Sequence, residues 1–188
     1  YLEGGIGTIS FIYFFFYGSL SWIAVFSEYR KSEKKRILKI ISKNQKKLKK
    51  WAGHAPMNFL HKYYLVEAER YRVLNRNAKA RELYDKAIAL AQENQYINEE
   101  ALACELAGKY YLTKEQKHIA QHYLKDAYQA YQKWGALAKV KDLENRYPNF
   151  FAQPKTTDPS SLLVSSMTAT SLRTSSTLDL GSVIKASQ

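Results

Sequence analysis

Apolar side chains between residues 33 and 51 recur at the spacing of one helix face, and lysines fill the opposite face. The apolar positions are Ile37, Leu38, Ile40, Ile41 and Leu48. This period predicts an amphipathic helix. Ser32 stands in the expected N-cap position with Glu33 in the first turn, and Gly53 and Pro56 mark the expected end. We therefore assign residues 28–55 to one basic amphipathic helix.

The residues before that helix, 4–27, contain no charged side chain. An uncharged stretch of this length is a candidate membrane span, and the basic cluster after it would act as a cytoplasmic anchor. Glycine, serine and threonine dilute the stretch, so a pair of buried helical segments broken near Gly18 fits the same pattern. Two interpretations of residues 1–27 stay open: the end of an upstream helical array, or a membrane anchor over residues 4–26.

Two copies of a 34-residue pattern follow, over residues 61–94 and 101–134, offset by 40 residues. Positions 4, 11 and 24 of each copy hold the side chains expected to fill the space between helices, and positions 8, 20 and 27 hold small residues. In the first copy these are Tyr64, Tyr71, Tyr84, Ala68, Ala80 and Ala87, and in the second Cys104, Tyr111, Leu124, Gly108, Ala120 and Ala127. We interpret the residues around 95–100 as an insertion between the copies.

This pattern resembles the tetratricopeptide repeat, in which small residues let two antiparallel helices approach closely while bulky residues fill the gaps. The resemblance implies an all-α fold of antiparallel helix pairs in an α-solenoid over residues 56–151. The repeats are degenerate, because Cys104 replaces a large aromatic residue, and Gln92 and Gln132 stand where the repeat has a proline. We expect looser packing around Cys104.

Residues that favour helix ends lie where these helix pairs need them. The expected caps are Asn77 and Asn98 as N-caps, Thr113 with Gln116 as a capping box, and Gly135 just after a helix. A final helix over residues 136–146, with Val140 and Leu143 facing inward, would end before Pro148 and cap the stack.

The C-terminal residues have a different composition. Half of residues 152–177 are serine or threonine, which predicts a flexible, disordered linker without a core. Leu178, Leu180, Val183 and Ile184 then lie on one side of a predicted helix over residues 178–188. A linker followed by a new helix predicts a further domain downstream.

Charge and cysteine content narrow the classes of function. The net charge is +12, and residues 30–50 hold eleven basic side chains against one acidic residue, Glu33. Such a run can bind phosphates or an anionic membrane, but its apolar stripe favours a solvated helix face, so nucleic-acid binding is not expected. The single cysteine, Cys104, excludes an internal disulfide and favours a reducing, cytoplasmic compartment.

No catalytic or cofactor-binding constellation is present in the sequence, and we expect no metal site. His118 and His122 have the spacing of metal ligands, but no third ligand is evident, so we interpret them as surface residues. His54 and His61 flank Pro56 and are expected to cap a helix or to bond between helices. Cys104 is expected in the core. A tyrosine stripe is expected to pack between helices: Tyr63, Tyr64, Tyr71, Tyr84, Tyr110, Tyr111, Tyr123, Tyr128 and Tyr131.

A binding surface is therefore the expected functional feature. In tetratricopeptide-like units the first helix of each pair lines the concave face. The equivalent positions in this chain are Lys62, Leu65, Glu69, Arg72, Glu105 and Lys109. A face of mixed charge is suited to a peptide or to a neighbouring domain.

Four longer runs resemble one family, the large multi-sensor signalling proteins of cyanobacteria and related bacteria. The runs are residues 51–70, 101–111, 127–148 and 178–188, among them the motifs WAGHAPMNFLHKYYLVEAER and LDLGSVIKASQ. These proteins carry a serine/threonine-kinase domain, an AAA-type ATPase domain, a helical-repeat region, a GAF sensor and often a histidine-kinase module.

The resemblance implies that this chain is a non-catalytic scaffold or relay segment of a cytoplasmic signalling kinase. It would lie between the ATPase and kinase domains and the sensor, and its partners would be domains of the same polypeptide or another protein. No catalytic residue of the family falls within these residues. The alternative is a membrane-anchored basic adaptor, with residues 4–26 in the bilayer.

Overall fold

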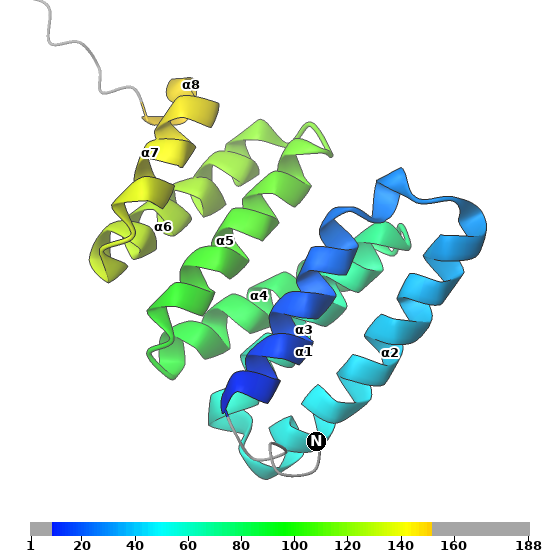
Figure 1. Ribbon diagram of the computed structural model, residues 1–188. Coiled ribbons are helices and arrows are strands. Elements are labelled where there is room, and N and C mark those ends of the chain that lie inside the picture. The colour runs from blue at the N-terminus through cyan, green and yellow to red at the C-terminus, as the bar shows by residue number, and fades with distance from the viewer. Residues whose placement is uncertain (1–8, 152–188) are drawn as a thin grey trace, which may run out of the picture. The chain divides into compact units, whose positions relative to one another are not determined.

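A computed structural model describes residues 9–151, and their regular structure is entirely helical, as the sequence predicts (Figure 1). The elements are α1 (Ile9–Ala24), the 3₁₀ helix η2 (Phe26–Glu28), α2 (Lys31–His54), α3 (Pro56–Val73), α4 (Asn77–Glu93), α5 (Ile97–Leu112), α6 (Lys117–Trp134), α7 (Leu137–Arg146) and α8 (Pro148–Phe151). The linker expected over residues 152–177 and the helix expected over residues 178–188 lie outside the described residues.

The helices form antiparallel hairpins that follow one packing rule. Helices α3 and α4 pair, as do α5 and α6, and α1 and α2 form a further hairpin of the same kind (Figure 1). The second helix of each hairpin also packs on the helix that follows it, so α2 contacts α3, α4 contacts α5 and α6 contacts α7. The first helices are neighbours as well, α1 with α3 and α3 with α5.

Helix α1 differs from the expectation for this stretch in one respect, the break near Gly18. Helix α1 runs through Gly18 without a break, and Phe16, Ser19 and Ile23 are buried against the rest of the stack. The Ser19 hydroxyl donates to the Phe15 carbonyl at 2.6 Å and accepts a 3.1 Å bond from the Asn44 side chain of α2. A hydroxyl that is satisfied in this way can be buried between helices at little cost.

Small residues occupy the crossings of the paired helices. Ala68, Ala80 and Ala87 are at most 1% exposed, and Ala120 and Ala127 are fully buried. An added Cβ at Gly108 would lie 2.6 Å from Cγ of Leu124. Real Cβ atoms essentially never come this close, so a side chain at position 108 would require Leu124 to shift or α5 and α6 to move apart.

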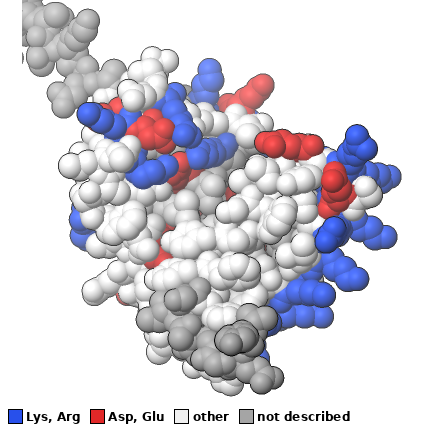
Figure 2. All heavy atoms as spheres, viewed as in Figure 1, with Lys and Arg blue, Asp and Glu red and all other residues white. Residues whose placement is uncertain are grey.

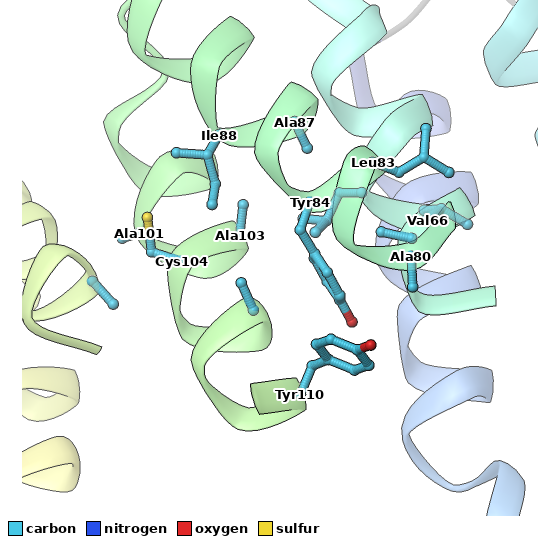
Figure 3. Close-up of a cluster of buried hydrophobic side chains, with 14 of the residues drawn as sticks. Val66, Ala80, Leu83, Tyr84, Ala87, Ile88, Ala101, Ala103, Cys104 and Tyr110 are labelled. Atoms are coloured by element: carbon cyan, nitrogen blue, oxygen red, sulfur yellow. The ribbon is translucent and has the colours of Figure 1, made fainter. Parts of the chain in front are cut away.

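The core between α3, α4 and α5 includes several positions that the repeat pattern singles out, among them Ala80, Tyr84, Ala87 and Cys104. Figure 3 shows Tyr84 and Ala87 of α4 packed beside Ala103 and Cys104 of α5 and Val66 of α3. Tyr84 is fully buried and Cys104 is 1% exposed. Cys104 is thus a core residue, as expected.

The turns explain the 40-residue offset and correct its interpretation as an inserted segment. Asn75, Gln95, Glu115 and Gly135, which recur every 20 residues, all have positive φ. After each of them the next residue donates its backbone N–H to a carbonyl five residues earlier; for example, Arg76 donates to Tyr71 at 2.9 Å. This is the left-handed turn that ends many helices. One helix plus one turn therefore takes 20 residues, and residues 97–100 form the first turn of α5, not an insertion.

Several expected helix ends differ from the observed ends. The N-cap of α2 is Arg30, not Ser32, and its backbone N–H donates to Glu33 Oε2 at 3.0 Å. This helix continues through Gly53 to His54. Asn77 is the first residue of α4 and Asn98 the second residue of α5, each after a different N-cap residue. Thr113 caps the C-terminus of α5 by donating to the Tyr110 carbonyl.

The end of the stack agrees with the sequence. Gly135 has φ of 83° in the left-handed region, where glycine carries no steric penalty. Val140 and Leu143 of α7 are buried. Pro148 ends this segment but also begins the short helix α8.

Replacing Gly108 by alanine is expected to destabilise the fold by about 1–3 kcal/mol, because the new methyl group overlaps Leu124 at the crossing of α5 and α6. Gly53→Ala is the matched control, since nothing lies within 4 Å of its Cβ position. That change is expected to be neutral or to stabilise α2 by up to about 1 kcal/mol. Urea unfolding followed by circular dichroism measures both, and equal stabilities would contradict the crossing geometry.

Candidate functional site

The six residues expected on a concave face all lie on the neighbouring helices α3 and α5. Four are on α3 and two on α5: Lys62, Leu65, Glu69, Arg72, Glu105 and Lys109. Helix α1 packs beside α3 in the same row of first helices. Arg72 and Lys109 keep 30% and 36% of their side-chain surface exposed. The other four are buried. Most of the expected polar surface is therefore interior, and its charged groups need partners there.

Glu69 is held by one partner from its own helix and one from α4. Arg72 donates from Nε to Oε1 at 3.0 Å and from Nη2 to Oε2 at 2.7 Å, and the Tyr84 hydroxyl also donates to Oε1. Burial and the Glu69 carboxylate raise the pKa of Tyr84 well above its ordinary value, which keeps this hydroxyl a donor. Burial opposes the charge of Arg72, but its bonds to Glu69 raise its pKa. The cluster ties α3 to α4.

Glu105 connects three helices. Its carboxylate accepts from Lys109 of α5 at 2.5 Å, from Lys139 of α7 at 2.8 Å and from the Tyr131 hydroxyl of α6 at 2.7 Å. Burial opposes its charge, but these hydrogen bonds lower the pKa of Glu105 to about 2. Burial and the Glu105 carboxylate raise the pKa of Tyr131. The Glu105 cluster therefore fixes α7 on the last hairpin.

A third cluster joins α3 to α5. Lys62 Nζ lies 3.2 Å from Glu99 Oε1, and both side chains are at most 4% exposed. The same Nζ lies 2.9 Å from His61 Nε2 and 4.2 Å from the centre of the Tyr96 ring. Burial and the neighbouring Lys62 lower the pKa of His61 to about 3, so the imidazole is neutral and accepts this bond. Burial and the Glu99 carboxylate also raise the pKa of the Tyr17 hydroxyl on α1.

A pocket of about 260 Å³ opens between α1, α3 and α5. Its lining residues are Leu20, Ala24, Glu69, Arg72, Leu106, Lys109, Tyr110 and Thr113. Three of the six expected residues, Glu69, Arg72 and Lys109, are thus brought together at one opening. Lys62, Leu65 and Glu105 are not part of its wall. The aliphatic part of the wall comes from Leu20, Ala24 and Leu106.

Sequence reasoning missed the partners of the buried charges. Glu99 and Lys139 were not singled out, and neither was the contribution of α1 to the pocket. Tyr131 was expected to pack between helices, but its hydrogen bond to Glu105 was not foreseen. The repeat pattern gave no signal of their burial, because it places Glu69 and Glu105 on the concave face and not at its packing positions. A buried carboxylate requires a cation or hydroxyl opposite it, and the identity of that partner depends on how the helices pack.

The other residues considered for chemistry have structural environments. His118 and His122 are exposed on α6, and among residues 9–151 no group of three or more possible ligands could hold a metal ion. His54 is exposed, whereas His61 bonds within the third cluster. Burial raises the pKa of the Cys104 thiol. Tyr84, Tyr110, Tyr111 and Tyr131 are buried, and the rest of the stripe packs partly exposed at helix contacts.

The basic run forms the exposed face of α2. Its solvent-facing cations are Lys31, Lys35, Arg36, Lys39, Lys43, Lys46, Lys47, Lys49 and Lys50, whereas Ile37, Ile41 and Leu48 are buried. This is the amphipathic helix that the sequence predicts. Between residues 9 and 151 no helix has the length and apolar character that crossing a membrane requires. The helix in the stretch considered as an anchor ends at Ala24.

Comparisons with known proteins support a signalling context. No family model matches the chain, and no solved structure matches it. The hybrid signal transduction histidine kinase G of Dictyostelium discoideum is 41% identical over 61 residues. The match covers 32% of this chain and 2% of that protein, so the chain corresponds to a small part of its relative.

Glu105→Gln tests the cluster that joins α5, α6 and α7. Because the pKa of Glu105 is about 2 in the folded chain, below the ordinary 4.5, its charge stabilises the fold above about pH 4.5. That contribution is lost as the pH falls towards 2. The variant is expected to lose about 2–4 kcal/mol of unfolding free energy at pH 7, and this deficit should shrink at pH 3.

Glu82→Gln is the control, because Glu82 also pairs with two lysines, Lys79 and Lys86, but on the open surface of α4. Its replacement is expected to change stability much less. Chemical unfolding of both variants at pH 7 and pH 3 gives the comparison. A deficit for Glu105→Gln that does not depend on pH would show that the carboxylate charge is not the stabilising feature.

Proposed function

We propose that this chain is a non-catalytic helical-repeat segment of a signalling kinase polypeptide, in which it acts as a scaffold and relay. Its partners are other domains of that polypeptide or another protein, in a cytoplasmic setting. The observation that carries the proposal is the run of 20-residue helix-and-turn units whose neighbours are joined by buried ion clusters. The match to a hybrid histidine kinase supports the kinase context.

The tetratricopeptide-like interpretation belongs to this proposal. The small residues at the crossings and the alternating contacts between hairpins favour it. The repeat unit is 40 residues rather than the usual 34, because each helix and its turn take 20 residues. On this interpretation the chain precedes a GAF sensor and follows an AAA-type ATPase domain, as the family resemblance implies.

The relay works through packing. The three clusters join α3 to α4, α3 to α5, and α5 to both α6 and α7. A buried charge that loses its partner carries a large desolvation cost, so these helices move together and not independently. A shift imposed at one end of the stack would reach the other end as a rigid displacement.

The pocket between α1, α3 and α5 is the proposed contact surface. It offers apolar contacts from Leu20 and Leu106 beside the partly exposed cations Arg72 and Lys109. Such a wall suits a peptide segment with apolar side chains next to an acidic group. Carboxylates already pair with both cations, so the segment must compete with Glu69 and Glu105 or add a second acceptor.

A photo-reactive amino acid at Thr113, in the pocket wall, tests the proposal in the full signalling polypeptide. We expect cross-links to a defined segment outside residues 9–151. Leu106→Glu should reduce their yield by at least about tenfold, because a carboxylate would replace an apolar contact. Mass spectrometry identifies the segment.

The control places the same photo-reactive group at Ile119, which is 42% exposed on α6 and does not line the pocket. That position is expected to give different products or none, without response to Leu106→Glu. If both positions yield the same products, or if Leu106→Glu leaves the yield at Thr113 unchanged, the pocket is not the contact surface.

A further inference from the structure

Helix α1 has an aromatic face that no described element covers. Phe14 is 70% exposed and Trp22 is 39% exposed, and Gly18 lies between them at a spacing of one helical turn on each side. Nothing lies within 4 Å of the Cβ position of Gly18. Two aromatic rings with a glycine between them form a notch, and a notch of this kind admits the backbone of another helix at close range.

The packing rule of the stack indicates which kind of element this face can bind. Helices α3, α5 and α7 each pack against the second helix of the preceding hairpin, namely α2, α4 and α6. On α3 that contact includes Phe59 against Trp51 and a bond from Gln45 to the Tyr63 carbonyl. Helix α1 is a first helix as well, yet among the described elements no preceding helix packs on it.

A cationic edge borders the notch. Lys47 of α2 places Nζ 4.8 Å from the centre of the Phe15 ring, and this ring meets Phe14 edge-on at 5.5 Å. Lys43 precedes Lys47 by one turn, and both are exposed without an ion pair to any described residue. Figure 2 shows the basic side chains of α2 beside a broad uncharged area.

We propose that the face formed by Phe14, Gly18 and Trp22 binds an amphipathic helix of a partner, whose apolar stripe enters the notch and whose glutamates or aspartates pair with Lys43 and Lys47. The partner helix takes the position on α1 that α2 takes on α3. The notch at Gly18 favours a helix as the ligand, because a helix backbone fits into it, whereas binding to a lipid surface does not require a notch. This surface is separate from the pocket beside Arg72 and Lys109, so either proposal can fail without the other.

Binding of a synthetic helical peptide to the whole chain tests this proposal. The probe is a labelled 18-residue amphipathic peptide with a leucine and alanine stripe flanked by glutamates, compared with the same peptide carrying lysines. Fluorescence anisotropy is expected to show binding of the glutamate peptide and at least about tenfold weaker binding of the lysine peptide. Lys43→Glu with Lys47→Glu should reverse this preference.

Gly18→Leu fills the notch and is expected to weaken binding by at least about tenfold. Gly53→Leu is the matched control, because its Cβ position also meets nothing within 4 Å, but on α2. Circular dichroism establishes that both variants are folded. Equal binding by the two glycine variants, equal binding of the two peptides, or no peptide binding overturns the proposal. Binding only to phosphatidylserine vesicles overturns it in favour of a membrane surface.

Discussion

The close approach of two helix backbones at Gly108 is the constraint on which the rest of the stack depends. At that crossing even a methyl group would overlap Leu124. Alanines take the same role in the preceding hairpin, where Ala68 and Ala80 are fully buried. Helices this close bring side chains from facing helices into contact, as for Glu69 with Tyr84 in the α3–α4 hairpin and Glu105 with Tyr131 in the α5–α6 hairpin.

Close packing buries several charged side chains, and each buried charge costs free energy unless it has a partner. Glu69, Glu99 and Glu105 are almost inaccessible to solvent, and each lies next to a lysine or arginine. A buried ion pair adds little net stability compared with apolar packing, but breaking one is costly. The main effect of these clusters is therefore to determine which helices pack together, and their net contribution to stability is smaller. In the proposed relay role, this property would keep the hairpins in one arrangement.

The left-handed turns set the period of the stack. They recur at Asn75, Gln95, Glu115 and Gly135, and only the last is a glycine. Asparagine tolerates this backbone region better than most residues, whereas glutamine and glutamate enter it with a steric cost that the repeated turn hydrogen bond offsets. The period could not be read from glycines alone, which is why the sequence suggested an insertion where the structure has a turn and the first turn of α5.

The sequence by itself determined some features of this protein, and only the tertiary structure decided others. The spacing of small and apolar residues determined by itself that the chain is helical, that residues 61–134 form two paired hairpins, and that Cys104, Val140 and Leu143 are buried, because these are properties of one helix face. The ends of helices were less predictable, since Asn77, Asn98 and Thr113 compete with neighbouring residues for the same backbone groups. Only the tertiary structure decided that α1 joins the stack, which cation each buried carboxylate meets, and which residues share a pocket. Those outcomes depend on residues far apart in the sequence, such as Ser19 with Asn44, Glu105 with Lys139, and Leu20 with Leu106 in the pocket wall, and no local pattern records them.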